Sequence, residues 1–199
     1  MTRVHCRPIG KAVFGIPVQV SPDHTATMDR TSTMKTFLSA VSALLLLSGA
    51  AWASDTATVN SFGSNSGDIE QVGSSSGKNT ATLSQGILNP NSSGNYGNIY
   101  QNGTNNVTNT ATTAQNGANN AAYVTQSGTA FSNSSTINQT GNGDRADVTQ
   151  VSYANTNASV ITQSGDSNYA KMMQLSNTAA NTTSIVQTGN GNSHTVNQH

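Results

Sequence analysis

The side chains that recur at a fixed interval in this sequence are amides, and hydrogen bonding is the chemistry open to them. Two glutamine series each repeat every 24 residues, and the second follows the first by 11 residues. The first series is Gln115, Gln139, Gln163 and Gln187, and the second is Gln126, Gln150, Gln174 and Gln198. Because a primary amide both donates and accepts, identical amides stacked at one repeat distance can form a continuous hydrogen-bonded ladder.

Two further series keep the same register. One stands six residues before each first glutamine and comprises Asn109, Asn133, Asn157 and Asn181. The other stands five residues after it and comprises Asn120, Asp144, Asn168 and Asn192. Glycine follows each first glutamine by two residues, at Gly117, Gly141, Gly165 and Gly189, where a tight turn needs a positive φ. We interpret the region as four tandem repeats and predict that the four amide series, here called the ladder positions, guide self-assembly.

Residues suited to catalysis or metal binding show no comparable pattern. Cys6 is the single cysteine, so neither a disulfide framework nor a thiolate metal site is expected. His194 has no second His or Cys at the spacing that a metal site needs. Residues 141–144 resemble a calcium-binding nonapeptide, but that signature works as a tandem repeat and here it occurs once. No Gly-x-Ser-x-Gly nucleophile elbow occurs. We therefore expect no enzyme activity, no cofactor and no metal.

The elements that must position the amides are short strands. In Asn157-Ser159-Ile161-Gln163 and in Asn168-Ala170-Met172-Gln174, the amides bracket small or aliphatic residues at every second position. Alternation at period two places all four side chains of a segment on one face of a strand. Four-residue turns containing glycine and six-residue turns join the segments. The sequence predicts an all-β fold, a cross-β solenoid of tandem 24-residue repeats with two strands per turn, here called a rung.

The 199-residue chain divides into four parts by composition. Residues 34–53 resemble a secretory signal peptide, with Met34-Lys35, an apolar stretch and Ala51-Trp52-Ala53 before Ser54. The apolar stretch falls short of the roughly 20 residues that a transmembrane helix needs. Since signal peptides begin at the N-terminus, we predict that residues 1–33 are a non-native upstream extension. Residues 54–108 are predicted to hold irregular repeats with longer turns, and residues 109–199 the four regular repeats.

Charge excludes one class of partner from the mature chain. Residues 54–199 contain Lys78, Arg145 and Lys171 against six acidic residues, a formal charge of about −3. Binding to nucleic acid requires clustered Lys and Arg to displace counterions. We therefore expect no nucleic-acid partner, and no transmembrane segment in the mature chain.

The string Gln-x-Gly-x-x-Asn-x-Ala-x-x-x-Gln, intact at residues 115–126 and 163–174, resembles the curlin repeat. The resemblance covers residues 109–198 closely and residues 65–101 loosely. It implies a subunit secreted by a Gram-negative bacterium that polymerises into curli-type amyloid fibres, or fimbriae, for biofilm matrix and adhesion. It also implies a nucleating minor curlin, an outer-membrane secretion pore and periplasmic chaperones as partners. The Gln198-His199 ending favours a major-type subunit.

The alternative is a monomeric secreted β-solenoid that acts as an adhesin or as an ice-binding protein. An ice binder should present a flat, regular Thr-x-Thr array on one outward face. One outward column, read at the repeat spacing, runs Tyr123, Asp147, Lys171 and Thr195, which is no such array. We therefore favour the polymerising subunit, whose homopolymer partner is the chain itself.

Overall fold

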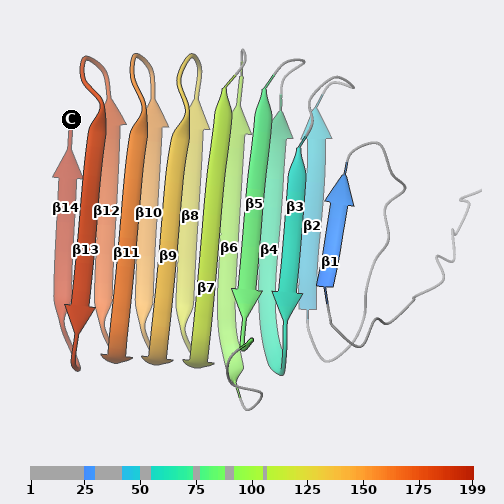
Figure 1. The fold of residues 1–199 in the computed structure, drawn as a ribbon, viewed down its shortest axis with the longest axis vertical. Coiled ribbons are helices and arrows are strands. Elements are labelled where there is room, and N and C mark those ends of the chain that lie inside the picture. Colours follow the sequence, from blue (N-terminus) through green and yellow to red (C-terminus); the bar gives the residue numbers. More distant parts are fainter. Residues whose placement is uncertain (1–24, 30–41, 50–54, 74–76, 88–91, 105–106) are drawn as a thin grey trace, which may run out of the picture.

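The predicted alternation of buried and exposed residues produces strands throughout the computed structural model, which describes residues 25–29, 42–49, 55–73, 77–87, 92–104 and 107–199. The strands form two series (Figure 1). The odd-numbered strands are β1 Thr25–Asp29, β3 Thr56–Ser61, β5 Lys78–Gln85, β7 Thr108–Ala118, β9 Asn133–Asn142, β11 Asn157–Asp166 and β13 Asn181–Thr188. The even-numbered strands are β2 Ser42–Gly49, β4 Ser64–Gly73, β6 Ser93–Gly103, β8 Ala121–Gly128, β10 Arg145–Ser152, β12 Tyr169–Ser176 and β14 Ser193–Gln198.

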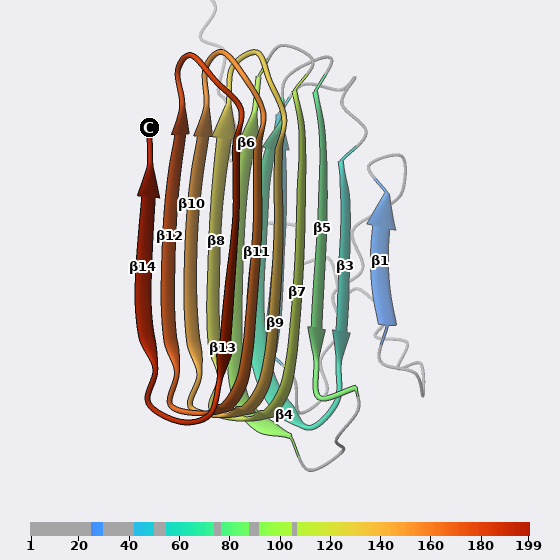
Figure 2. The ribbon, with the colours of Figure 1, turned by 60° about the vertical axis from the view of Figure 1, so that its left-hand side comes forward.

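The chain alternates between two parallel sheets that face each other (Figure 2). The odd-strand sheet runs β3-β5-β7-β9-β11-β13, and β1 adds to it antiparallel to β3. The even-strand sheet runs β2-β4-β6-β8-β10-β12-β14. A bridge between Ser93 and Ala118 links the two sheets at one corner. Each odd strand and the following even strand of the regular repeats form one rung, so the predicted solenoid with two strands per rung is confirmed.

The repeat identity sets the strand register. Gln139 pairs with Gln163, and Ile137 with Ile161, so each strand lies against its own copy 24 residues away. Inward side chains are buried while their neighbours in sequence are half-buried or exposed, as on β11, where residues 157, 159, 161 and 163 are buried and residues 158, 160 and 162 are not. A shift by one residue would turn every amide outward, so the buried pattern specifies the register strongly.

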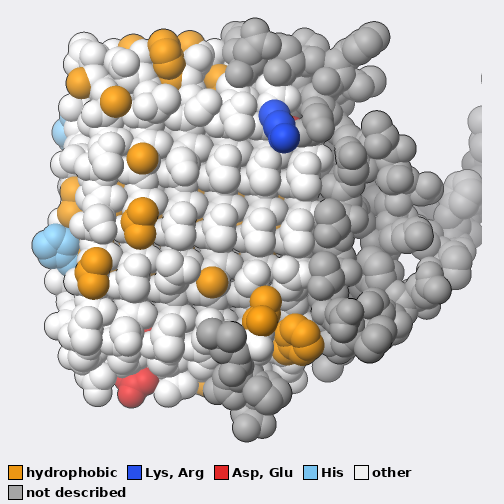
Figure 3. All heavy atoms as spheres, in the orientation of Figure 1, with side chains coloured by type: hydrophobic (Ala, Val, Ile, Leu, Met, Phe, Trp, Pro, Cys, Tyr) orange, Lys and Arg blue, Asp and Glu red, His pale blue; other side chains and the backbone are white. Residues whose placement is uncertain are grey.

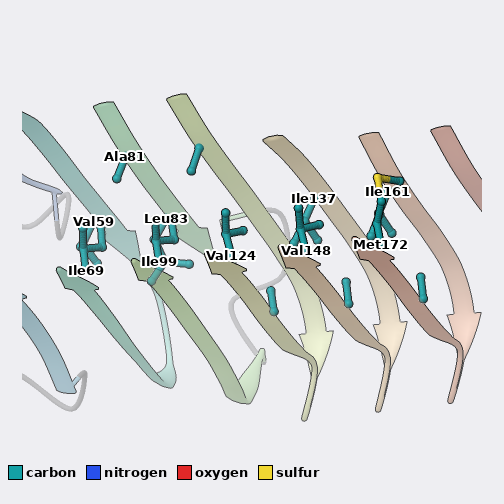
Figure 4. Packing of buried hydrophobic residues seen from close by; sticks show 14 of the residues in the cluster. Val59, Ile69, Ala81, Leu83, Ile99, Val124, Ile137, Val148, Ile161 and Met172 are labelled. Carbon is teal, nitrogen blue, oxygen red and sulfur yellow. The ribbon is translucent and has the colours of Figure 1, made fainter. Parts of the chain in front are cut away.

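The core is a single row of aliphatic side chains between the sheets (Figure 4). A regular rung contributes few large ones, for example Ile161 from the odd strand and Met172 from the even strand, with Ser159 and Ala170 beside them. The buried large aliphatic residues are Val59, Ile69, Leu83, Ile99, Val107, Val124, Ile137, Val148, Ile161, Met172 and Ile185. The core is thin, so amides occupy much of the interior.

The N-terminal part continues the same stack. Asn79, Leu83 and Gln101 are buried in this part, in the region where the resemblance to the curlin repeat is loose. Asn79 pairs with Asn109 across 30 residues, which reflects the longer turns. The sequence reading missed strand β3, which places Ala57 and Val59 in the core.

Two strands precede the predicted mature chain. Within the predicted signal peptide, β2 pairs in parallel with β4, and β1 belongs to the predicted upstream extension. The predicted cleavage site at residues 51–54 lies outside the described residues. In the part of the chain that the structure describes, no helix has the length and apolarity needed to cross a membrane.

Candidate functional site

The glutamines form two continuous ladders inside the solenoid. In the odd-strand sheet, Nε2 of each glutamine donates to Oε1 of its copy in the next rung. The donor–acceptor distances are 2.9 Å for Gln115 to Gln139, 3.0 Å for Gln139 to Gln163 and 2.8 Å for Gln163 to Gln187. In the even-strand sheet they are 2.8 Å for Gln126 to Gln150, 2.8 Å for Gln150 to Gln174 and 2.9 Å for Gln174 to Gln198. Both ladders therefore run in one direction, from donors on earlier rungs to acceptors on later ones.

The same glutamines also join the two sheets. Nε2 of Gln139 donates to the carbonyl of Ala121 at 3.0 Å, and Nε2 of Gln150 donates to the carbonyl of Ser134 at 2.9 Å. Each amide nitrogen thus uses one hydrogen along the stack and one across the interior, where the side chain is fully buried. The sequence reading missed the cross-sheet bond, because the acceptor is a backbone carbonyl that any residue type supplies.

The asparagine ladder of the odd-strand sheet runs the other way. Nδ2 of Asn133 donates to Oδ1 of Asn109 at 2.9 Å, and Nδ2 of Asn157 donates to Oδ1 of Asn133 at 2.9 Å. Asn181 bonds to Asn157 in the same way at 3.1 Å. The second hydrogen of Asn157 reaches the carbonyl of Val151 at 3.0 Å. These asparagines therefore close the six-residue turn as well as link the rungs.

The fourth series contains a defect at Asp144. Its backbone N–H donates to Oδ1 of Asn120 at 2.9 Å, and its own Oδ1 accepts from the backbone and the Nδ2 of Asn168 at 2.9 and 3.0 Å. An aspartate has no Nδ2 to return to Asn120, and Oδ2 of Asp144 is buried without a hydrogen-bond partner. Burial raises the pKa of this carboxyl, and the hydrogen bonds from Asn168 offset part of the increase.

The turn glycines are required for two reasons: the positive φ that the sequence predicts, and the close stacking of the turns, which the sequence does not indicate. Their φ angles are all positive, at 120° for Gly117, 133° for Gly141, 119° for Gly165 and 97° for Gly189. In addition, the turns stack so closely that a Cβ on Gly141 would lie 1.7 Å from the carbonyl oxygen of Gly165. Gly189 has no later rung against it, and its nearest neighbour would be 3.8 Å away. The next residue but one is also left-handed in each turn, at Asn119, Gly143, Ser167 and Gly191.

The ladders extend beyond the four regular repeats. Nε2 of Gln85 donates to Gln115 at 2.9 Å, and Nε2 of Gln101 donates to Gln126 at 2.8 Å. Gln71 in turn donates to Gln101 at 2.7 Å. The hydroxyl of Ser61 lies 3.5 Å from Oε1 of Gln85 and takes the place of a glutamine on β3. Strands β3, β4, β5 and β6 thus belong to the same hydrogen-bonded array as the regular repeats.

The two ends of the array present complementary groups. At the C-terminal end, β13 and β14 form the last rung, and Nε2 of Gln198 has no acceptor among the described residues. A hollow lined by Ile185, Gln187 and His194 opens at this end, so the inward position of His194 is exposed rather than packed. At the other end, Oε1 of Gln71 is buried without a donor. The β2 residue paired with it is Leu47, which cannot continue the ladder.

Comparison with known proteins adds no assignment to these features. No family model, curated protein or solved structure matches the chain. Among the described residues, no three His, Cys, Asp or Glu side chains lie close enough to share a metal ion. The interpretation of the site therefore rests on its geometry.

Proposed function

We propose that this chain is the structural subunit of an extracellular, curli-type amyloid fibre, in which copies stack end to end in the register of the rungs. The observation that carries the proposal is the polarity of the glutamine ladders. Gln198 offers an unused amide donor at one end, and Gln71 offers an unused acceptor at the other. Both residues belong to the same column of the even-strand sheet.

A second copy stacked in the same orientation would place Gln71 Oε1 against Gln198 Nε2 and would continue the ladder without reversal. A copy stacked in the opposite orientation would set donor against donor. Among the described strands, β14 pairs on one side only, with β12, and an unpaired parallel edge pairs readily with another strand. Head-to-tail growth is therefore the arrangement that satisfies both the backbone and the amides.

The thin core also favours stacking. A regular rung buries about two large aliphatic side chains, which is far less than an isolated unit needs to offset its chain entropy. In a solenoid the interfaces between neighbouring rungs supply the missing stability. Stability should therefore increase with the number of rungs in contact, and a fibre is the limit of that series.

The two strands that precede the predicted cleavage site are consistent with head-to-tail stacking. Strands β1 and β2 cover the N-terminal edges of β3 and β4. Cleavage after Ala53, as the sequence predicts, would remove both strands and uncover the Gln71 acceptor. Under this proposal secretion and the exposure of the assembly edge are coupled, and the minor curlin, the secretion pore and the chaperones implied by the resemblance would act on the uncovered chain.

Seeded assembly kinetics of the secreted chain test the proposal. We expect a lag in thioflavin fluorescence that preformed fibres abolish, and fibre diffraction with the two cross-β spacings. Gln198→Glu removes the terminal donor and should slow seeded elongation roughly two- to tenfold, the equivalent of one lost hydrogen bond.

The matched control is Asn197→Asp, which adds the same charge on the exposed side of the same strand. It should elongate nearly as fast as the wild type at moderate salt. Equal slowing by both variants would assign the effect to charge and not to the ladder. A wild-type chain that stays monomeric for days at micromolar concentration, even with seeds, would refute the proposed function.

A further inference from the structure

The outward face of the odd-strand sheet carries threonines in two columns. They occupy alternate residues of four successive strands, as Thr56 and Thr58 on β3 and as Thr80 and Thr82 on β5. The first column is Thr56, Thr80, Thr110 and Ser134, and the second is Thr58, Thr82, Thr112 and Thr136. Strand pairing puts the members of each column directly beside one another. We call these eight side chains the threonine face.

The hydroxyls of the threonine face are free to bind something outside the molecule. Seven of the side chains are partly exposed, and Ser134 is fully exposed. Within the described residues, none of these hydroxyls has a hydrogen-bond partner. The interior ladders use the backbone carbonyls of Thr56, Thr80 and Thr110 and leave the side chains unengaged.

The surface around the threonines is flat and carries little charge. Figure 3 views the odd-strand sheet from outside and shows straight rows of mostly uncharged side chains. The exposed Lys78 at the start of β5 lies on this face, two residues before Thr80. The charged residues of the strands lie mainly on the even-strand sheet, which includes Asp68, Arg145, Asp147 and Lys171. The column Tyr123, Asp147, Lys171, Thr195 that argues against ice binding in the sequence belongs to that opposite sheet.

The spacing of the threonines selects the ligand. Neighbouring strands lie about 4.7–4.9 Å apart, and alternate residues along a strand lie about 6.6 Å apart. The array is therefore periodic in two directions, as the surface of a crystal is. Each threonine presents a hydroxyl that can take a lattice position and a methyl group that orders the water around it. Branching at Cβ restricts χ1, so the array keeps its alignment before contact.

We propose that the threonine face binds ice. Among the described residues of β3, β5, β7 and β9, Lys78 is the one charged side chain on this face, so the surface offers little electrostatic complement to a protein or a nucleic acid. A two-dimensional array of hydroxyls and methyls instead matches a crystalline water surface. The activity is independent of polymerisation, because the face is perpendicular to the stacking edges. Stacked copies would repeat the array along a fibre.

Thermal hysteresis and ice-crystal shaping by the secreted chain test this proposal. We expect the wild type to separate the freezing and melting temperatures and to produce faceted crystals. Thr112→Lys places a long cation at the centre of the array and should abolish most of this activity. Circular dichroism should show the β-sheet signal unchanged, because the side chain is outward and has no partner in the fold.

The matched control is Thr125→Lys, the same substitution at an outward, exposed position of β8 on the opposite sheet. It should retain wild-type hysteresis. Unshaped ice with the wild type, or equal loss in both variants, would overturn the proposal. If Thr112→Lys leaves ice behaviour unchanged but reduces the side-by-side bundling of fibres, the face is a contact between copies and the proposal is likewise wrong. Seeded elongation should be unaffected by Thr112→Lys, so failure here is distinct from failure of the fibre proposal.

Discussion

Inward-facing and outward-facing positions of the same strands follow different rules. Inward, a residue usually lies against its own type, as Gln150 lies against Gln174. Outward, the pairing varies: Asp147 meets Lys171 on the even-strand sheet, whereas Thr82 meets Thr112 on the odd-strand sheet. The difference arises because a buried amide must find its partners inside the stack, whereas water satisfies an exposed side chain. The interior therefore enforces identity and register, and the exterior is free to give the two sheets different surfaces.

Gln150→Leu tests the importance of the inward amides and should have the largest effect on stability. The change leaves Nε2 of Gln126 without an acceptor and Oε1 of Gln174 without a donor, both in buried positions. With about 1–3 kcal/mol for each of the two unsatisfied buried groups, the free energy of unfolding should fall by roughly 2–6 kcal/mol. Urea denaturation at a concentration too low for assembly measures it. The control is Thr149→Val on the outward side of the same strand, which should change stability by less than about 0.5 kcal/mol.

Asp144→Asn should repair the one ladder position of the four regular repeats that departs from its series. Asparagine supplies an Nδ2 donor for Asn120 and removes a buried carboxylate whose Oδ2 has no partner. At neutral pH we expect the variant to be more stable by roughly 1–2 kcal/mol.

The gain should depend on pH. Because burial raises the pKa of Asp144, ionisation disfavours the folded state, so the wild type loses stability as pH rises from the ordinary aspartate pKa through the raised one. Below the ordinary value the carboxyl is neutral in both states and the penalty is absent. Unfolding measured across this range should show the advantage of the variant growing with pH. An advantage of constant size would assign it to the hydrogen bond alone.

For outward positions we expect the smallest change in stability, and Arg145→Ala tests it. The guanidinium Nε lies 3.2 Å from Oδ2 of Asp147, and its carbon lies 5.1 Å from the ring centre of Tyr123 and 5.9 Å from that of Tyr169. The Arg145 side chain is 55% exposed, so water and salt screen these contacts. Removal should cost less than about 1 kcal/mol. A cost as large as that of Gln150→Leu would abolish the distinction between interior and exterior.

The rungs before Asn109 show that the aliphatic residues of the interior can change while the amides stay the same. In these rungs Leu83 packs against Gly67 and Gly97, where an added Cβ would lie 2.1 and 2.3 Å from the leucine methyl carbons. The larger side chain thus fills the volume that the glycines leave, which conserves the packed volume. The ladders pass through these rungs unchanged. The amides are therefore more constrained than the aliphatic residues between them.

The interior of this protein was predictable from its sequence. The 24-residue recurrence of amides and the alternation between them predict the strands, the two-stranded rung and the four ladder columns from residue 109 onward. The physical reason is burial: a buried amide needs a hydrogen-bond partner, and an amide that bonds to its own copy has to recur at the period of the stack. The same logic located the turn glycines, although not their close approach to one another.

The exterior and the ends required the tertiary structure. Thr80 and Thr110 are neighbours across a 30-residue interval, so a reading at the regular period does not align them. The bonds between glutamines and the carbonyls of the opposite sheet depend on how the two sheets face each other, and the residue type of the acceptor gives no signal. Outward positions have no partner that must recur, so their arrangement into a charged sheet and a threonine face is decided only when the longer turns bring the strands into register.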